Sequence, residues 1–390
     1  MANFCGKCGS RLDGDTGRCP RCDREKIPGR RGRKRVASRT WLAVVVVLAV
    51  IILLGLFAKL GYDALSRNAA GFSADASVSG SSIAPAGTES LGKDRPTLRS
   101  DYEVPSGGED AMPVYNVFGS TVEKEKIASM KFLNSLADAP ADAWDVSEAG
   151  DHSVLAWVTP TDDQRYDLFI AGDGGVWAPE DCTYLFAEYR WMDSLDFNDA
   201  FFVDQCKTMK GMFFHDQFLA ELDLSGWDTS SVTDMSEMFY FCSGIKKLDL
   251  SRFDTSTVTD MNSMFNRCES IENLDLSGFD TSHVTDMSSM FFQAWNLAKL
   301  NVGGFDTSLV TDMSFMFSQV WALDELDLSS FDTSSVEDSL AFLDGGVAVK
   351  KLTIGPKFDV TILRNAAESI PFMAENGTIN GYPWKDFLHI

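Results

Sequence analysis

The stretch Leu248-Asp-Leu-Ser-Arg-Phe-Asp-Thr-Ser-Thr-Val-Thr-Asp-Met-Asn-Ser-Met-Phe-Asn-Arg-Cys268 is one copy of a sequence that recurs every 26 residues. Its opening apolar-x-apolar triplet returns without insertion at Leu222, Leu248, Leu274, Leu300, Leu326 and Leu352. A fixed period of this length predicts a solenoid, in which each repeat buries its apolar side chains only against its neighbours. We assign the repeats to residues 182–356.

Within this copy the pattern predicts a short strand followed by a short helix. Leu248 and Leu250 alternate with polar residues, as in a strand with one buried face. In residues 258–265, Val, Met, Met and Phe recur at three- and four-residue steps, which is typical of a helical stripe. Thr257 and Asp260 have the spacing of a capping box. The expected fold class is therefore an α/β repeat solenoid with one strand and one helix per repeat.

Non-repeating sequence flanks the array on both sides. Residues 111–181 contain strand-like runs around an apparent helix near Glu123–Ala137, and they are expected to cap the N-terminal end of the solenoid. Residues 357–390 are expected to cap the other end. Such terminal elements shield the core of a repeat array from water.

The repeat resembles that of the BspA-like leucine-rich repeat proteins, a bacterial surface family. Their copies read much like Leu274-Asp-Leu-Ser-Gly-Phe-Asp-Thr-Ser-His-Val-Thr-Asp-Met-Ser-Ser-Met-Phe291. The segment from Val117 to Gly175 is similar to the leader that precedes such repeats, so the resemblance covers residues 115–356. It implies a leucine-rich-repeat-like fold and a binding or adhesion role at the cell surface, without enzymatic activity.

An apolar segment predicts a single transmembrane helix at residues 41–60. Nineteen uncharged residues separate Arg39 from Lys59, which is enough for a helix to cross a bilayer core of about 30 Å. Twelve Lys and Arg residues precede the segment, against four acidic residues, so the positive-inside rule places residues 1–40 in the cytoplasm. A cleaved signal peptide is the alternative. Its charged region would be unusually long, and no clear small-x-small cleavage site follows at once.

The charge of the chain changes sign across this segment. With Lys59 included, residues 1–60 carry 13 basic and four acidic residues, a net +9, so residues 61–390 carry −32 in a chain that totals −23. We expect the acidic part to be extracellular and not to bind nucleic acid. Residues 27–40 form a basic juxtamembrane segment that is expected to contact the cytoplasmic membrane. Residues 61–110 are rich in Ser, Ala and Gly and predict a flexible stalk.

Residues 1–26 contain two Cys-x-x-Cys pairs that predict a cytoplasmic zinc ribbon. Together they offer four thiolates that can surround one Zn²⁺ ion tetrahedrally: Cys5, Cys8, Cys19 and Cys22. A disulfide pair or a redox motif is the alternative, but cytoplasmic thiols stay reduced and so short a segment needs a metal to fold. Four protein ligands leave no open position, so the zinc is expected to be structural. The segment resembles the small zinc ribbons at the N-termini of many bacterial membrane proteins.

Two tryptophans and a phenylalanine are the candidate ligand contacts. Trp295 and Trp321 occupy a repeat position that is Ser243 and Glu269 in the preceding copies, so their side chains are expected to face solvent. Phe292 is close to them in the sequence. Exposed aromatic side chains suit the faces of sugars and the hot spots of protein partners. The alternative is that these rings pack beneath the C-terminal cap or along the edge of the loops.

A row of aspartates raises the alternative of calcium binding. One strand position is Asp223, Asp249, Asp275 and Asp327 in successive copies, and calcium prefers several oxygen ligands. Asn301 interrupts the row, which favours solvated carboxylates instead.

Two cysteines of the repeats are expected to be free, buried thiols. Cys242 and Cys268 lie one period apart and could approach disulfide distance. However, Ala294 and Val320 occupy the same position in later copies, which indicates that the position requires a small apolar side chain.

The composition offers no catalytic constellation. The four histidines are scattered and no nucleophile accompanies them: His152, His215, His283 and His389. We therefore expect a single-pass bacterial membrane protein with a cytoplasmic N-terminus, whose solenoid binds an extracellular protein or glycan. The alternative is a signalling or assembly protein that couples the extracellular part to partners of the zinc ribbon. The sequence contains no signal for an oligomeric state.

Overall fold

The computed structural model describes residues 95–100, 115–345, 349–363 and 373–388. All of them belong to the second of the two units of the chain, Thr88–Ile390. The predicted zinc ribbon, basic segment and transmembrane helix, residues 1–60, lie outside the described residues. In the part of the chain that is described, no helix combines the length and the apolarity needed to cross a membrane.

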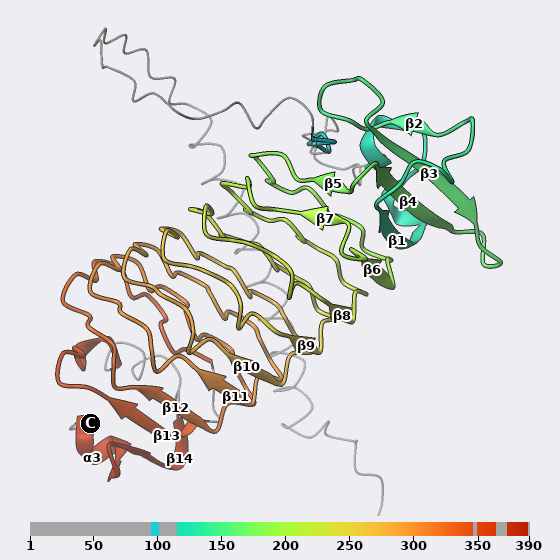
Figure 1. Ribbon diagram of the computed structural model, residues 1–390. Coiled ribbons are helices and arrows are strands. Elements are labelled where there is room, and N and C mark those ends of the chain that lie inside the picture. The colour runs from blue at the N-terminus through green and yellow to red at the C-terminus, as the bar shows by residue number, and fades with distance from the viewer. Residues whose placement is uncertain (1–94, 101–114, 346–348, 364–372, 389–390) are drawn as a thin grey trace, which may run out of the picture. The chain divides into compact units, whose positions relative to one another are not determined.

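The N-terminal part of the second unit is a mixed sheet (Figure 1). Its five strands follow the order β2-β3-β4-β1-β6: β2 (Trp144–Asp145), β3 (Val154–Pro160), β4 (Tyr166–Gly172), β1 (Ile127–Leu133) and β6 (Ser194–Asp196). β3 and β4 are antiparallel, whereas β1 runs parallel to both β4 and β6. The short 3-10 helices η2 (Val117–Gly119) and η3 (Lys124–Lys126) precede β1.

The prediction of a helix near residues 123–137 is therefore wrong, because this segment forms η3 and then β1. Met130 and Phe132 are buried and alternate with the half-buried Lys131 and Leu133. That alternation is the period of a strand and not of a helix.

The repeats form coils whose strands pair in phase. β8 (Glu221–Leu222) pairs in parallel with β9 (Lys247–Leu248), β10 (Asn273–Asp275) with β11 (Lys299–Asn301), and β12 (Glu325–Leu328) with β13 (Val349–Ile354). In each pair the leucines of successive triplets are direct partners, for example Leu274 and Leu300. At the N-terminal end β5 (Val176–Trp177) pairs with β7 (Phe201–Phe202). The C-terminal end consists of β14 (Met373–Ile379), β15 (Tyr382–Pro383) and α3 (Trp384–Leu388).

The predicted fold class, a solenoid with a helix and a strand in each repeat, is wrong. The strands are short and belong to five separate sheets among the described residues. Within residues 182–345, all of which are described, no helical segment occurs. Each coil consists instead of short strands and turns (Figure 1).

Hydrogen bonds between coils explain why the expected helix does not form. Alternate N–H groups point along the stack: that of Glu237 donates to the carbonyl of Asn262 at 2.8 Å, and that of Phe239 to the carbonyl of Met264 at 3.0 Å. The N–H groups of a helix would instead bond within their own segment. Pairing with the next coil satisfies these groups and joins the repeats.

The same segment contains left-handed backbone at non-glycine residues. Ser263 and Ser289 have φ angles of 54° and 56°, and Arg267 and Gln293 both have 59°. The predicted capping box does not form either, because the Thr257 hydroxyl donates to the carbonyl of Val232 at 2.8 Å. Side chains at three- and four-residue steps thus reach the core from consecutive turns.

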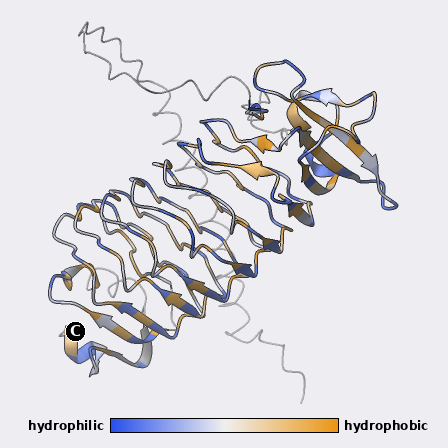
Figure 2. Cartoon of the chain, in the orientation of Figure 1, coloured by the Kyte–Doolittle hydropathy of each residue, from blue (hydrophilic) through white to orange (hydrophobic). Residues whose placement is uncertain are grey.

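Phenylalanine rings stack through the centre of the repeats. Neighbouring rings lie 5.5–5.8 Å apart with their planes within 3–11° of parallel: Phe213, Phe239, Phe265, Phe291 and Phe317. The Met residues of the same turns are buried around them. Figure 2 shows the apolar positions recurring in phase from coil to coil. Because each ring contacts its own counterparts, one sequence position determines the packing of the whole stack.

Polar side chains stabilise the turns. Asp249, Asp254 and Asp260 each accept a hydrogen bond, 2.8–3.0 Å long, from the backbone N–H two residues further on. The buried Thr281 links two coils, because its hydroxyl donates to the carbonyl of Asp306 and accepts from the N–H of the same residue, both at 2.8 Å. These bonds give the frequent Asp and Thr residues of the repeats a structural role.

A disulfide and a buried hydrogen bond join the first coils to each other. Cys182 and Cys206 form a disulfide, which was not predicted from the sequence. Asp216, which is fully buried, occupies the position of Cys242 and Cys268 and accepts a 2.9 Å hydrogen bond from the N–H of Tyr189. Burial raises the pKa of Asp216 well above its usual range, although the neighbouring charge of Lys124 opposes this rise.

Candidate ligand-binding surface

One edge of the coils carries the candidate ligand contacts. Parallel bridges run from coil to coil through Asp181, Thr208, Asp234, Asp260, Asp286 and Asp312. The residues nine and ten positions after these bridge residues recur at one place in each coil, and we call them the corner row. It consists of Arg190, Trp191, Gln217, Phe218, Ser243, Gly244, Glu269, Ser270, Trp295, Asn296, Trp321 and Ala322.

The two tryptophans predicted as ligand contacts lie together in this row. The rings of Trp295 and Trp321 stack with centroids 5.2 Å apart and planes 4° from parallel. Trp321 is 45% exposed, while Trp295 is half-buried. The Trp321 Nε1 donates to the carbonyl of Gly345 at 2.9 Å, which holds its ring at the surface. The pair therefore presents one fixed aromatic surface to solvent.

Phe292 does not join the tryptophans in a shared stack. It is half-buried, and its ring packs edge-on against Phe315 at 5.9 Å. This contact gives Phe292 a packing partner within the coil edge. The tryptophan pair is therefore the better-supported part of the predicted contact set.

A second aromatic pair occupies the N-terminal end of the corner row. Trp191 and Phe218 are 48% and 50% exposed, and their rings stack at 4.7 Å. This pair was not predicted from the sequence, because its members are 27 residues apart, one more than the repeat period. Trp191 precedes Trp295 by 104 residues, which is four repeat periods, and that spacing is the signal that would have found it.

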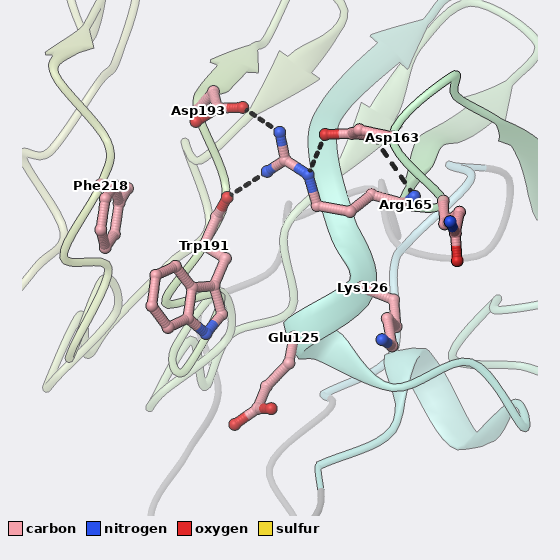
Figure 3. A pocket seen from close by; sticks show the side chains of 8 residues that line it. Glu125, Lys126, Asp163, Arg165, Trp191, Asp193 and Phe218 are labelled. Atoms are coloured by element: carbon pink, nitrogen blue, oxygen red, sulfur yellow. Dashed lines mark hydrogen bonds and ion pairs between the residues drawn. The ribbon is translucent and has the colours of Figure 1, made fainter.

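This second pair borders a hollow of about 670 Å³ (Figure 3). Glu125 and Lys126 line it from the segment before β1, and Asp163 and Arg165 from the loop between β3 and β4. The first coil contributes Trp191 and Asp193, and the next contributes Phe218. The hollow is thus assembled from segments far apart in the sequence.

Arg165 connects these segments through three hydrogen bonds. Its Nε donates to Asp163, its Nη1 to the carbonyl of Trp191 and its Nη2 to Asp193, each at 2.7 Å. Hydrogen bonds from Thr161 and then Arg165 lower the pKa of Asp163 to about 2. Hydrogen bonds to Asp193 and Asp163 raise the pKa of the Arg165 guanidinium. Arg165 is therefore paired with two carboxylates, those of Asp163 and Asp193.

The strand face of the repeats holds a second hollow and the row of aspartates considered for calcium. Asp249, Asp275 and Asn301 line this hollow, whose volume is about 690 Å³. Hydrogen bonds from the backbone and hydroxyl of Ser251 lower the pKa of Asp249. Among the described residues, no group of three or more His, Cys, Asp or Glu side chains is arranged to hold a metal ion. The four predicted zinc ligands, residues 5, 8, 19 and 22, lie outside the described residues.

The remaining candidate residues are buried or are in contact with other side chains of the protein. Cys242 and Cys268 are buried free thiols, as expected, and burial raises the pKa of both. The Nδ1 of His215 lies 3.2 Å from the carboxylate of Glu188. Burial disfavours the charged form of Glu188, but hydrogen bonds with His215 and Arg190 outweigh it and lower its pKa. The expectation that the chain is not an enzyme stays a prediction.

Comparisons with known proteins confirm the resemblance only for the repeats. Neither a search of curated proteins nor a search of solved structures found a match. Two overlapping segments, residues 180–275 and 268–351, match a family model described as "Mycoplasma protein of unknown function, DUF285". Residues 180–351 are therefore similar to this family.

Proposed function

We propose that this chain is a membrane-anchored bacterial surface protein whose repeats bind an extracellular macromolecule through the corner row. The observation that carries the proposal is the Trp295–Trp321 stack. Large aromatic side chains replace the polar residues of earlier copies there, and Trp321 is 45% exposed. The core does not require them, because the phenylalanine stack already fills it. Surface aromatics held in a fixed orientation lose little entropy on binding.

Binding of the purified full chain to arrays of extracellular-matrix proteins and glycans tests this function. We expect a hit that the Trp295→Ala, Trp321→Ala double variant loses. Tyr382→Ala is the matched control, because Tyr382 is 65% exposed on β15 and outside the corner row. The proposal fails if a folded double variant binds as well as the original chain.

The membrane anchor in this proposal rests on sequence alone. The apolar segment at residues 41–60 and the basic residues before it favour a single-pass topology with a cytoplasmic N-terminus. Protease treatment of intact cells tests the orientation. We expect the repeats to be digested and an N-terminal tag to be protected. Digestion of the tag in intact cells would contradict the proposed topology.

A further inference from the structure

We propose that the hollow beside Trp191 is a carbohydrate subsite, which binds one neutral pyranose unit of a glycan against the exposed tryptophan ring. This site is separate from the Trp295–Trp321 pair and does not depend on that pair binding a ligand. Its lining comes from η3, from the loop between β3 and β4, and from the first two coils. The volume of about 670 Å³ lies within the range of roughly 300–1,000 Å³ that is usual for small-molecule sites.

The aromatic surface of the hollow is held in place before any ligand binds. Phe218 packs on the Trp191 ring at 4.7 Å, and Arg165 fixes the backbone of Trp191 through its 2.7 Å hydrogen bond to the carbonyl. In Figure 3 the Trp191 ring lies between Phe218 and the side chains of Glu125 and Lys126. A flat apolar surface with polar groups beside it matches a pyranose, which has an apolar C–H face and a rim of hydroxyls.

The charges of the lining favour a neutral ligand. Glu125, Asp163 and Asp193 would repel an anionic sugar, while Lys126 and Arg165 would repel a cationic side chain. Asp163 and Asp193 are already paired with Arg165. A sugar hydroxyl both donates and accepts hydrogen bonds, so it can pair with groups of either charge.

Three exposed polar side chains are placed to bind such hydroxyls. Glu125 supplies acceptors, Lys126 supplies donors, and the Gln164 amide supplies both. They come from two different segments, so they approach the hollow from separate directions. The Trp191 ring would select the apolar face of the sugar, and these groups would select its hydroxyl pattern.

The test measures binding of the full chain to neutral, sialylated and sulfated glycans, followed by titration of the best neutral oligosaccharide. We expect neutral glycans to be preferred and Trp191→Ala to weaken binding about tenfold or more. Arg165→Lys should also weaken it, because Lys cannot maintain three fixed hydrogen bonds. Trp191→Phe keeps a smaller ring, so it should retain part of the affinity if the ring is the platform.

Tyr382→Ala is the control, because Tyr382 lies on β15 outside the corner row, and it should leave binding of the neutral oligosaccharide unchanged. Loss of array hits in the Trp295→Ala, Trp321→Ala variant and loss of neutral-oligosaccharide binding in the Trp191→Ala variant are scored separately, which keeps the two sites distinguishable. Preference for anionic glycans, absence of neutral-glycan binding, or unchanged affinity in the folded Trp191→Ala variant would each overturn the proposal. Circular dichroism shows whether each variant is folded.

Discussion

The middle of the repeats and their N-terminal end bury equivalent phenylalanines among different neighbours. Phe265 stacks between Phe239 and Phe291, at 5.7 and 5.8 Å, and both are its counterparts in adjacent coils. Phe186 contacts such a counterpart only on one side. On the other it meets Phe132 of β1 edge-on, also at 5.8 Å. An end coil thus depends on a neighbour with unrelated sequence.

This difference explains why the sequence pattern degrades at the N-terminal end. In the middle, a residue is selected for contact with copies of itself, and the period stays at 26. At the end, residues adapt to the sheet: Asp216 replaces the small apolar residue, and Phe218 follows Trp191 by 27 residues instead of 26. The irregular positions therefore mark the junction where the second aromatic pair and its hollow occur.

The largest expected effect tests the self-stacking of the middle repeats. Phe265→Ala should lower the free energy of unfolding by about 3–5 kcal/mol, because a fully buried ring leaves a cavity between two fixed rings. Phe169→Ala in the N-terminal sheet should cost less, since Phe169 is only half-buried against Trp157. Urea unfolding measures both. If both variants lost the same free energy of unfolding, the repeats would not depend on their stacked rings more than the N-terminal sheet depends on its own.

The next effect tests how the N-terminal coils are held. Replacing both Cys182 and Cys206 by Ala should cost about 3 kcal/mol, because the disulfide closes a loop of 24 residues in the unfolded chain. A reductant should lower the melting temperature of the original protein but not of this variant. Cys242→Ala, which removes a free thiol, should leave the reductant effect intact. Insensitivity of the original protein to reductant would contradict the bond's role.

A smaller effect is expected on the pH dependence of stability, which should differ between two aspartates of one repeat. Burial raises the pKa of Asp260 to about 6, and the nearby Asp234 and Asp286 add to the rise. The folded chain then retains a proton that the unfolded chain has lost, so stability falls as pH rises from about 4 to 6. Asp260→Asn should raise the free energy of unfolding at pH 7 by on the order of 1 kcal/mol. Near pH 4 the variant and the original protein should be equally stable.

Asp254 should behave in the opposite way. Hydrogen bonds from the hydroxyl and then the N–H of Ser256 lower its pKa, so its stabilising contribution is present at neutral pH and declines as the pH falls below the usual range. Asp254→Asn should therefore destabilise the protein slightly at pH 7. Thermal melts of both variants between pH 4 and 7 check the signs. The same sign for both variants would contradict the assigned environments.

The smallest effect concerns an exposed repeat position. Leu309 is 51% exposed where other copies have Ser231, Thr257, His283 and Ser335. Leu309→Ser should change the free energy of unfolding by less than about 0.5 kcal/mol, because no packed contact is lost. The same urea titration measures it. A loss above about 1 kcal/mol would show that this side chain packs more tightly than its exposure indicates.

Several features were predictable from the sequence because they depend on period and polarity. The pairing of Leu274 with Leu300, the burial of Cys242 and the exposure of Trp321 all follow from comparing one repeat with the next. The absence of the expected helix was not predictable. Residues 258–265 place apolar side chains at helical steps, yet their alternate N–H groups bond to the next coil, which a single repeat cannot reveal.

The sequence by itself determined the register of the repeats and which positions enter the core, because both follow from a 26-residue period that copies the same environment in each coil. The way the turns are made and the place of the hollow beside Trp191 depend instead on contacts between segments of the folded chain. The turns depend on hydrogen bonds between coils. The hollow depends on Arg165 meeting the first coil across 26 residues of unrelated sequence, a contact that no local pattern encodes.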